Sequence, residues 1–173
     1  MLFENSHIDL DQLPQVEATP LQSLAPAYPK VMHIGNVILY SILGLILLPV
    51  WFKTELSTHP LAYIVPLIWV FLYLSSTFLV SWSYRVQGYA IRERDIIYRR
   101  GVFFRKTTVI PFNRVQHCEV KQGPVERFFN LSSLEVYTAG GQSSDLRIPG
   151  LAGDLASQLK SFIIKRTAAH EDH

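Results

Sequence analysis

Residues that could carry out chemistry are few in this chain and lie far apart. The histidines are His7, His33, His59, His117, His170 and His173. A metal site needs several ligands that converge on one point, whereas these histidines fall in the chain ends, an uncharged stretch, a short polar segment and a β-rich segment. His170 and His173 have helical spacing, but because they lie at a charged chain end we interpret them as an exposed, unstructured pair and not as a ligand pair. Glycine-rich nucleotide loops are absent as well. We expect no metal and no cofactor.

The candidates for nucleophilic or acid–base catalysis are equally sparse. Cys118 is the only cysteine, so no internal disulfide can form. Its neighbour His117 would point to the opposite face of a strand, so the two cannot share a proton, and a buried cysteine is the simpler interpretation. Asp145 and Glu135 could face each other across a hairpin, but acid–base work also needs a cleft. We expect no catalytic residues and no enzyme.

Basic side chains are the remaining feature with a chemical use. They are Arg85, Arg92, Arg94, Arg99, Arg100, Arg105 and Lys106. From residue 83 onward, 14 Lys and Arg face 9 Asp and Glu, although the whole chain carries only +2, too little to indicate nucleic acid. Such side chains are attracted to anionic lipid. We expect a lipid-facing basic surface with a general attraction for membrane lipid, although topology alone would also place arginines here.

Two uncharged stretches must position that surface. Val31 to Phe52 and Leu61 to Trp82 contain no Asp, Glu, Lys or Arg, and each is long enough to cross a bilayer core of about 30 Å as a helix. Only KTELSTHP, residues 53–60, joins them, so they form an antiparallel hairpin over residues 31–82. Apolar residues make up 49% of the chain and charged residues only 17%, which favours lipid solvation over burial in a soluble core.

The orientation of the hairpin follows from its flanking charges. Several arginines follow Trp82, whereas the connection carries Lys53 alone. The positive-inside rule therefore predicts cytoplasmic N- and C-termini. Residues 1–30 are acidic, hold four prolines and have no Lys or Arg before residue 30, so they are predicted to be an uncleaved disordered tail. A segment that orders on binding a partner is the alternative.

The segment 84–166 changes to short runs rich in β-branched and aromatic residues. The predicted strands are residues 84–91, 95–99, 102–110, 114–121, 134–138 and 144–148. Gly101 and Gly140-Gly141 supply tight turns, and Gly123-Pro124 opens a short helical turn. A helix over 151–166, with Leu155 and Leu159 on its apolar face, packs on the strands. This predicts a membrane α-helical hairpin followed by a small barrel or sandwich of six or seven antiparallel strands, and a disordered end at 167–173.

The run IPFNRVQHCEVKQGPVERFFNLSSLEVYTAGG, residues 110–141, resembles the YdbS-like bacterial PH-domain membrane proteins. The resemblance covers the helices and extends to about Phe162. It implies a seven-strand pleckstrin-homology-like (PH-like) barrel capped by the C-terminal helix, a bacterial plasma-membrane location and no catalytic residues to carry over. Phosphoinositide-binding PH domains use basic residues near the turn between their first two strands, where Arg92 and Arg94 fall.

Two functions fit these observations. The first is a non-catalytic, membrane-anchored PH-like scaffold or adaptor at the bacterial inner membrane, which binds a protein partner or a second copy of itself through exposed strand edges. The second is a lipid or small-ligand binding protein, or a transport accessory, that uses the basic surface and the helix pair.

Overall fold

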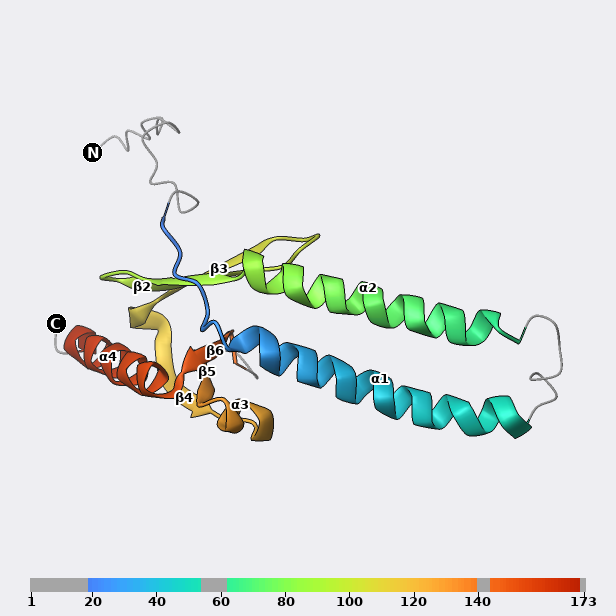
Figure 1. Cartoon of the computed structure of the whole chain (residues 1–173). Helices are drawn as coiled ribbons and strands as arrows, with labels where there is room; N and C mark the ends of the chain where they lie inside the picture. Colours follow the sequence, from blue (N-terminus) through green and yellow to red (C-terminus); the bar gives the residue numbers. More distant parts are fainter. Residues whose placement is uncertain (1–18, 54–61, 140–143, 172–173) are drawn as a thin grey trace, which may run out of the picture.

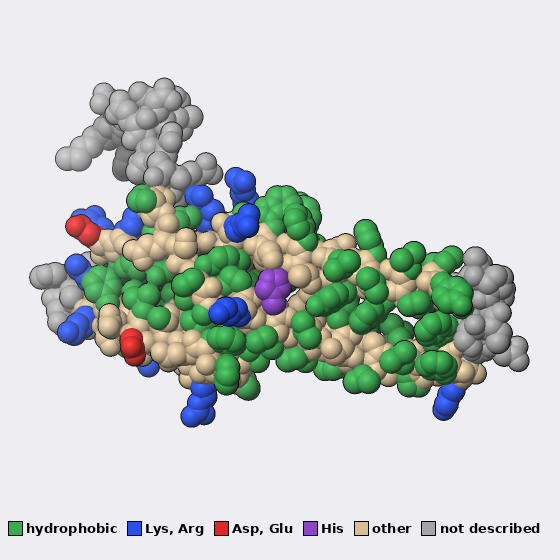
Figure 2. Space-filling view, viewed as in Figure 1, with side chains coloured by type: hydrophobic (Ala, Val, Ile, Leu, Met, Phe, Trp, Pro, Cys, Tyr) green, Lys and Arg blue, Asp and Glu red, His purple; other side chains and the backbone are tan. Residues whose placement is uncertain are grey.

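Two long apolar helices lie side by side and project from one end of a β-rich domain (Figure 1). The computed structural model describes residues 19–53, 62–139 and 144–171. Helix α1 is Tyr28–Lys53 and α2 is Ile64–Val86, each long and apolar enough to cross a membrane. Hydrophobic side chains cover their surfaces (Figure 2), and Asn36 is the only buried residue among them. Surfaces of this kind require lipid as their solvent.

Both helices are longer than the uncharged stretches that predicted them. Pro29 lies in the first turn of α1, where a helix tolerates proline because that N–H has no partner within the helix. Helix α2 continues through Val86 and so takes residues 84–86, which were predicted as strand. Only Gln87 separates α2 from the first strand, so the domain follows directly from the membrane helix.

Polar side chains hold the two helices together at their domain ends. The amide of Asn36 donates to Oγ1 of Thr77 (3.0 Å) and accepts from the hydroxyl of Ser76 (3.1 Å). One turn earlier in α1, His33 Nε2 lies 3.1 Å from the hydroxyl of Ser81. Because later residues of α1 meet earlier residues of α2, the helices are antiparallel, as predicted. Their connection, 54–61, lies outside the described residues.

The domain contains two three-stranded antiparallel sheets. The A sheet is β1 (Gly88–Ile91), β2 (Asp95–Arg100) and β3 (Lys106–Pro111), in that order. The B sheet is β4 (Val115–Lys121), β5 (Leu131–Thr138) and β6 (Leu146–Ala152). A 3₁₀ turn, η4 (Phe112–Arg114), joins the sheets; α3 (Pro124–Phe128) lies between β4 and β5, and α4 (Gly153–Glu171) follows β6.

The core lies between the two sheets and α4. Ile96, Phe112, Leu134, Ile148 and Ile163 are fully buried there and come from β2, η4, β5, β6 and α4 respectively. The predicted closing helix is therefore present. The predicted contact residues Leu155 and Leu159 are only partly buried, whereas Ala156 and Ile163 are fully buried, so the most buried face of α4 is rotated slightly from those two leucines.

The family resemblance implied a closed barrel, and the structure shows that this expectation is wrong. Within the described residues the six strands form two separate sheets with no hydrogen-bonded pairing between them. The chain turns through η4 directly after Pro111, which has no N–H for a sheet ladder, so β3 and β4 separate instead of pairing. Strand β1 is too short to continue around a barrel because α2 extends to Val86. The predicted turn at Gly140-Gly141 lies outside the described residues.

Residues 19–27, here called the strap, connect the sheets ahead of α1. Gln22 pairs with Tyr89 of β1 through two backbone hydrogen bonds, and the N–H of Ala25 donates to the carbonyl of Gly150 in β6 (2.9 Å). Leu24 is only 2% exposed and belongs to the domain core. The predicted disordered tail therefore extends too far: this part of it packs, because its apolar side chains reach a surface that sequence patterning did not reveal. Residues 1–18 lie outside the described residues.

Candidate functional site

The loop between β2 and β3 presents basic and aromatic side chains together. It lies within the run RRGVFFRK, residues 99–106, and residues 101–105 are here called the tip. Gly101 has φ +104°, and a side chain there would collide with the carbonyl oxygen of Phe104. Only glycine fits this turn without strain. The tip is therefore a tight turn of defined shape, and it holds Phe103 and Phe104 outward, 73% and 91% exposed.

The tip lies beside the domain end of α2. Figure 1 shows the loop after β2 reaching back along the end of α2. The ring of Phe103 is 6.3 Å from that of Trp82, in an edge-to-face arrangement, and Trp82 in turn meets Phe78 at 6.0 Å. The single arginine of α2, Arg85, follows within one turn. Lys and Arg side chains adjoin a protruding group of hydrophobic side chains above this end of the helix pair (Figure 2).

The structure divides the seven predicted site residues into two groups. Four lie in or directly beside the tip, with Arg100 opposite Lys106 in the strand register, and a fifth lies at the end of α2. Those five are Arg85, Arg99, Arg100, Arg105 and Lys106. Arg92 and Arg94 lie in the β1–β2 turn at the far end of β2, roughly 17 Å away at the rise of a strand. The seven side chains therefore do not form one pocket.

Arg92 is also committed to an internal contact. Its guanidinium donates two hydrogen bonds of 2.6 Å to the carboxylate of Asp95, a bidentate pair that closes the turn. In contrast, none of the five cations at the tip and at the end of α2 forms an ion pair with any carboxylate that the structure describes. Their charge is available to an external anion.

A hollow of about 300 Å³ adjoins the tip on α2. It is lined by Phe78, Ser81, Trp82 and Arg85. Because the hollow combines aromatic walls with one arginine at the end of an apolar span, it matches the chemistry of the boundary between lipid tails and headgroups.

The B sheet carries a second charged group, which is paired internally. Glu135, only 8% exposed, accepts hydrogen bonds from Lys121 (2.7 Å) and from the hydroxyl of Tyr137 (2.9 Å), and Arg147 lies 3.6 Å away. The hydrogen bond from Lys121 holds the pKa of Glu135 below its ordinary value. His117 stacks on Tyr137 with ring centroids 4.2 Å apart. This network joins neighbouring strands and has the character of a structural element.

The residues considered as candidates for catalysis, Cys118, Asp145 and Glu135, lie in separate surroundings. Cys118 is buried, as expected, and burial raises its pKa to about 11, so its thiol is a poor nucleophile. Asp145 does not face Glu135 across the hairpin, because it accepts from the hydroxyl of Thr138 (2.6 Å), whereas Glu135 is opposite Arg147. Among the described residues no three His, Cys, Asp or Glu side chains are grouped to hold a metal.

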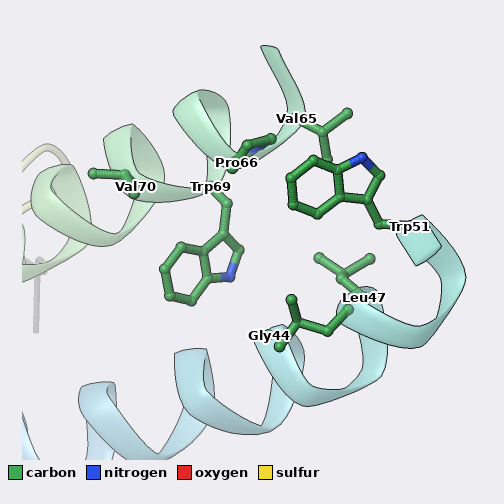
Figure 3. Close-up of a pocket in the computed structure, with 8 residues that line it drawn as sticks. Gly44, Leu47, Trp51, Val65, Pro66, Trp69 and Val70 are labelled. Atoms are coloured by element: carbon green, nitrogen blue, oxygen red, sulfur yellow. The ribbon is translucent and has the colours of Figure 1, made fainter. Parts of the chain in front are cut away.

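A cleft of about 250 Å³ lies between α1 and α2 at the ends away from the domain. Figure 3 shows Trp51 and Trp69 projecting from opposite helices toward the space between them, with Leu47, Val65 and Pro66 around them. The lining is apolar, so the cleft suits a hydrocarbon chain. It is separated from the basic tip by the length of the helices, which is why the two cannot form one ligand site.

Sequence reasoning missed two features. Phe103 and Phe104 were placed in a predicted strand, although adjacent apolar residues in a strand cannot both face one core; that doublet after Gly101 was the available signal. The polar contacts between the helices were missed because each stretch was considered only for its lack of charge. His33, Asn36 and Tyr40 recur at helical spacing and indicate a common face.

Comparisons with known proteins agree with this architecture. The profile of the bacterial PH domain family matches residues 37–167. The chain is 24% identical over 156 residues to the transmembrane protein YdbS of Bacillus subtilis, covering 88% of this chain and 96% of that protein. It is also 24% identical over 105 residues to the transmembrane protein YdbT of the same organism, covering 60% of this chain and 21% of that protein. No solved structure matches.

Proposed function

The chain belongs to the bacterial PH domain family, and from this premise we propose that it is a non-catalytic adaptor, anchored in the bacterial inner membrane, that binds a protein partner or a second copy of itself. Its two apolar helices provide the anchor. Its PH-like domain provides the binding surface, at a height above the lipid that is set by the direct passage from α2 into β1. Nucleic acid is not part of the proposal.

The observation that carries this proposal is the outer edge of β3. Among the described strands, β3 pairs only with β2, so its other edge is open to an added strand. Thr107 is exposed there, and Val109 is 38% exposed. Lys106 and Pro111 stand at the two ends of the strand and limit uncontrolled pairing. An open edge with such limits is suited to β-augmentation by one specific segment.

A photo-crosslinking amino acid at Thr107 tests the proposal in native membranes. We expect capture of a protein of distinct mass, or of a second copy at twice the monomer mass. Val109→Lys should remove that product, because a charge on the open edge opposes strand addition. The same crosslinker at Gln158, exposed on α4, is the control. A protein product that persists with Val109→Lys, or no protein product at all, would overturn the adaptor function.

The alternative is a lipid or small-ligand binding protein. The five cations around the tip and the hollow on α2 give it support, and products containing only lipid in the same experiment would favour it. The cleft between the helices lies at the other membrane boundary, so it supplies no part of a basic ligand site.

The proposal includes a topology, with both termini in the cytoplasm. Lys53 is the only basic residue near the far ends of the helices, whereas arginines crowd the domain end. Alkaline phosphatase fused after residue 57 should be active, and the same enzyme fused after residue 150 should be inactive. The reverse pattern would show that the domain faces the other side.

A further inference from the structure

Phe103 and Phe104, in the tip, are far more exposed than is favourable for aromatic side chains in contact with water. Phe104 is more exposed than any other large hydrophobic side chain described. The exposed fraction of Phe103 is as large as that of the most exposed apolar side chains of α1 and α2. Exposed apolar area of this size is unfavourable in water and marks a contact site. Both rings lie in the tight turn that begins at Gly101, whose φ of +104° only glycine adopts without strain.

The depth of these rings follows from their contact with α2. Trp82 is near the end of the uncharged stretch, and Arg85 is the first charge after it, so this helical turn lies at the boundary between tails and headgroups. Phe103 touches Trp82, with ring centroids 6.3 Å apart. The tip therefore lies at the same depth as Trp82 and extends the aromatic series that Phe78 and Trp82 begin.

The side chains around the two rings are positively charged and lie where lipid headgroups would be. Arg99, Arg100, Arg105 and Lys106 flank the two phenylalanines, and none is paired with a carboxylate within the described residues. Cations at headgroup level bind lipid phosphates, and aromatic rings between them reach the acyl region. A protein partner would have to share this space with the leaflet that surrounds α2.

We propose that the tip is a membrane wedge: Phe103 and Phe104 insert into the leaflet beside α2 while the four flanking cations bind anionic phosphates. With α1 and α2 as the first anchor, this second contact fixes the tilt of the A sheet over the lipid. The inference is independent of whether the β3 edge binds a protein. It requires only that the domain rests on the leaflet that its helices enter.

The wedge can be tested on the full chain in vesicles of phosphatidylcholine with phosphatidylglycerol. A fluorophore is attached at Thr107→Cys, beside the tip, and is quenched by lipids that carry a nitroxide near the headgroup. Cys118 can stay in place because it is buried. A second chain labelled at Glu93→Cys, in the turn at the other end of β2, is the reference. We expect quenching at position 107 to be at least threefold stronger than at position 93.

Substitutions separate insertion from mere proximity. Phe103→Ser with Phe104→Ser should at least halve the quenching at position 107, whereas Ile164→Ser, which removes an exposed side chain from α4, should leave it unchanged. The turn itself remains, so folding is retained and is checked by cooperative unfolding. Equal quenching in the double variant and the parent would overturn the wedge.

A separate experiment tests whether the cations beside the two rings contribute to membrane contact. Replacing the four cations of residues 99–106 by Gln should weaken quenching in the anionic vesicles toward the value in pure phosphatidylcholine, and high salt should do the same through screening. The matched control replaces four cations away from the tip, Arg114, Lys160, Lys165 and Arg166. An effect of the control equal to that of the tip would show that only total charge matters and would overturn the assignment to the tip.

Discussion

The A and B sheets of this domain use their charged side chains in different ways. On the B sheet, Lys121 and Arg147 both approach the carboxylate of Glu135, and the contacts link three neighbouring strands. On the A sheet, Arg92 is the only cation paired with a described carboxylate, and it closes a turn far from the membrane helices. Charge on the B sheet therefore contributes to the fold, whereas charge on the A sheet remains available for contacts outside the chain.

A substitution in the core that both sheets share should give the largest loss of stability. Ile163 of α4 is fully buried between the sheets, and Ile163→Ala should lower the free energy of unfolding by about 2–5 kcal/mol. Denaturant unfolding of the full chain in mild detergent measures this. Ile164→Ala, at a neighbour 47% exposed, should change stability by less than about 0.5 kcal/mol. Equal responses at the two positions would show that α4 is not docked through this face.

Disrupting the strap that connects the two sheets should give the second-largest loss of stability. Gly150 of β6 has φ +62°, and a side chain there would collide with the ring of Tyr28. Gly150→Ala should therefore destabilise the domain by roughly 1–3 kcal/mol and loosen the strap, which increased proteolysis within residues 19–27 would report. Gly35→Ala in α1, where an added methyl group meets nothing within 4 Å, is the control. A stable Gly150→Ala chain with an unchanged cleavage pattern would contradict this packing.

The charge network should make the B sheet sensitive to acid. Because Lys121 lowers the folded-state pKa of Glu135, ionised Glu135 stabilises the fold above the unfolded-state pKa of about 4.3, and this contribution is lost as pH falls through the lower folded value. Stability should thus fall between about pH 5 and pH 3, and Glu135→Gln should flatten that part of the curve. Glu93→Gln should preserve it. Parallel pH curves for the parent and Glu135→Gln would mean that the network does not carry the effect.

The A sheet should give the smallest stability effect. Replacing the basic residues of the run 99–106 by Gln should shift the free energy of unfolding by no more than about 0.5 kcal/mol, because they have no paired carboxylate among the described residues. The unfolding midpoint in detergent, without anionic lipid, is the measurement. A loss as large as that of Ile163→Ala would remove the distinction between the two sheets.

The sequence predicted the parts of this fold that depend on local pattern. Absence of charge located both membrane helices, runs of β-branched and aromatic residues between turn formers located six strands, and apolar residues at helical spacing located the closing helix. The strap could not be predicted, because Leu24 becomes buried only through surfaces made by residues distant in the chain. The same is true of the separation of the two sheets, which depends on the turn at η4 and on where α2 ends.

The candidate site was predicted in composition but not in arrangement. Arginine content indicated a basic surface, yet the sequence could not show that Arg92 pairs with Asp95 or that β2 separates the two basic groups. The aromatic part of the site escaped because Val102 to Arg105 have strand-like composition, and only the turn geometry at Gly101 takes them out of the ladder.

The strap sets the order in which the chain can be assembled during synthesis. It leaves the ribosome before either membrane helix, yet its backbone partners Tyr89 and Gly150 are made after both helices. The hydroxyl of Tyr84, at the end of α2, also reaches the carbonyl of Leu24 (3.1 Å). In the proposed topology with two membrane spans, a chain with only one inserted helix would hold the strap and the strands on opposite sides of the bilayer. In that topology, completion of the domain requires that both helices have crossed, and their pairing shortens the search for distant strand contacts.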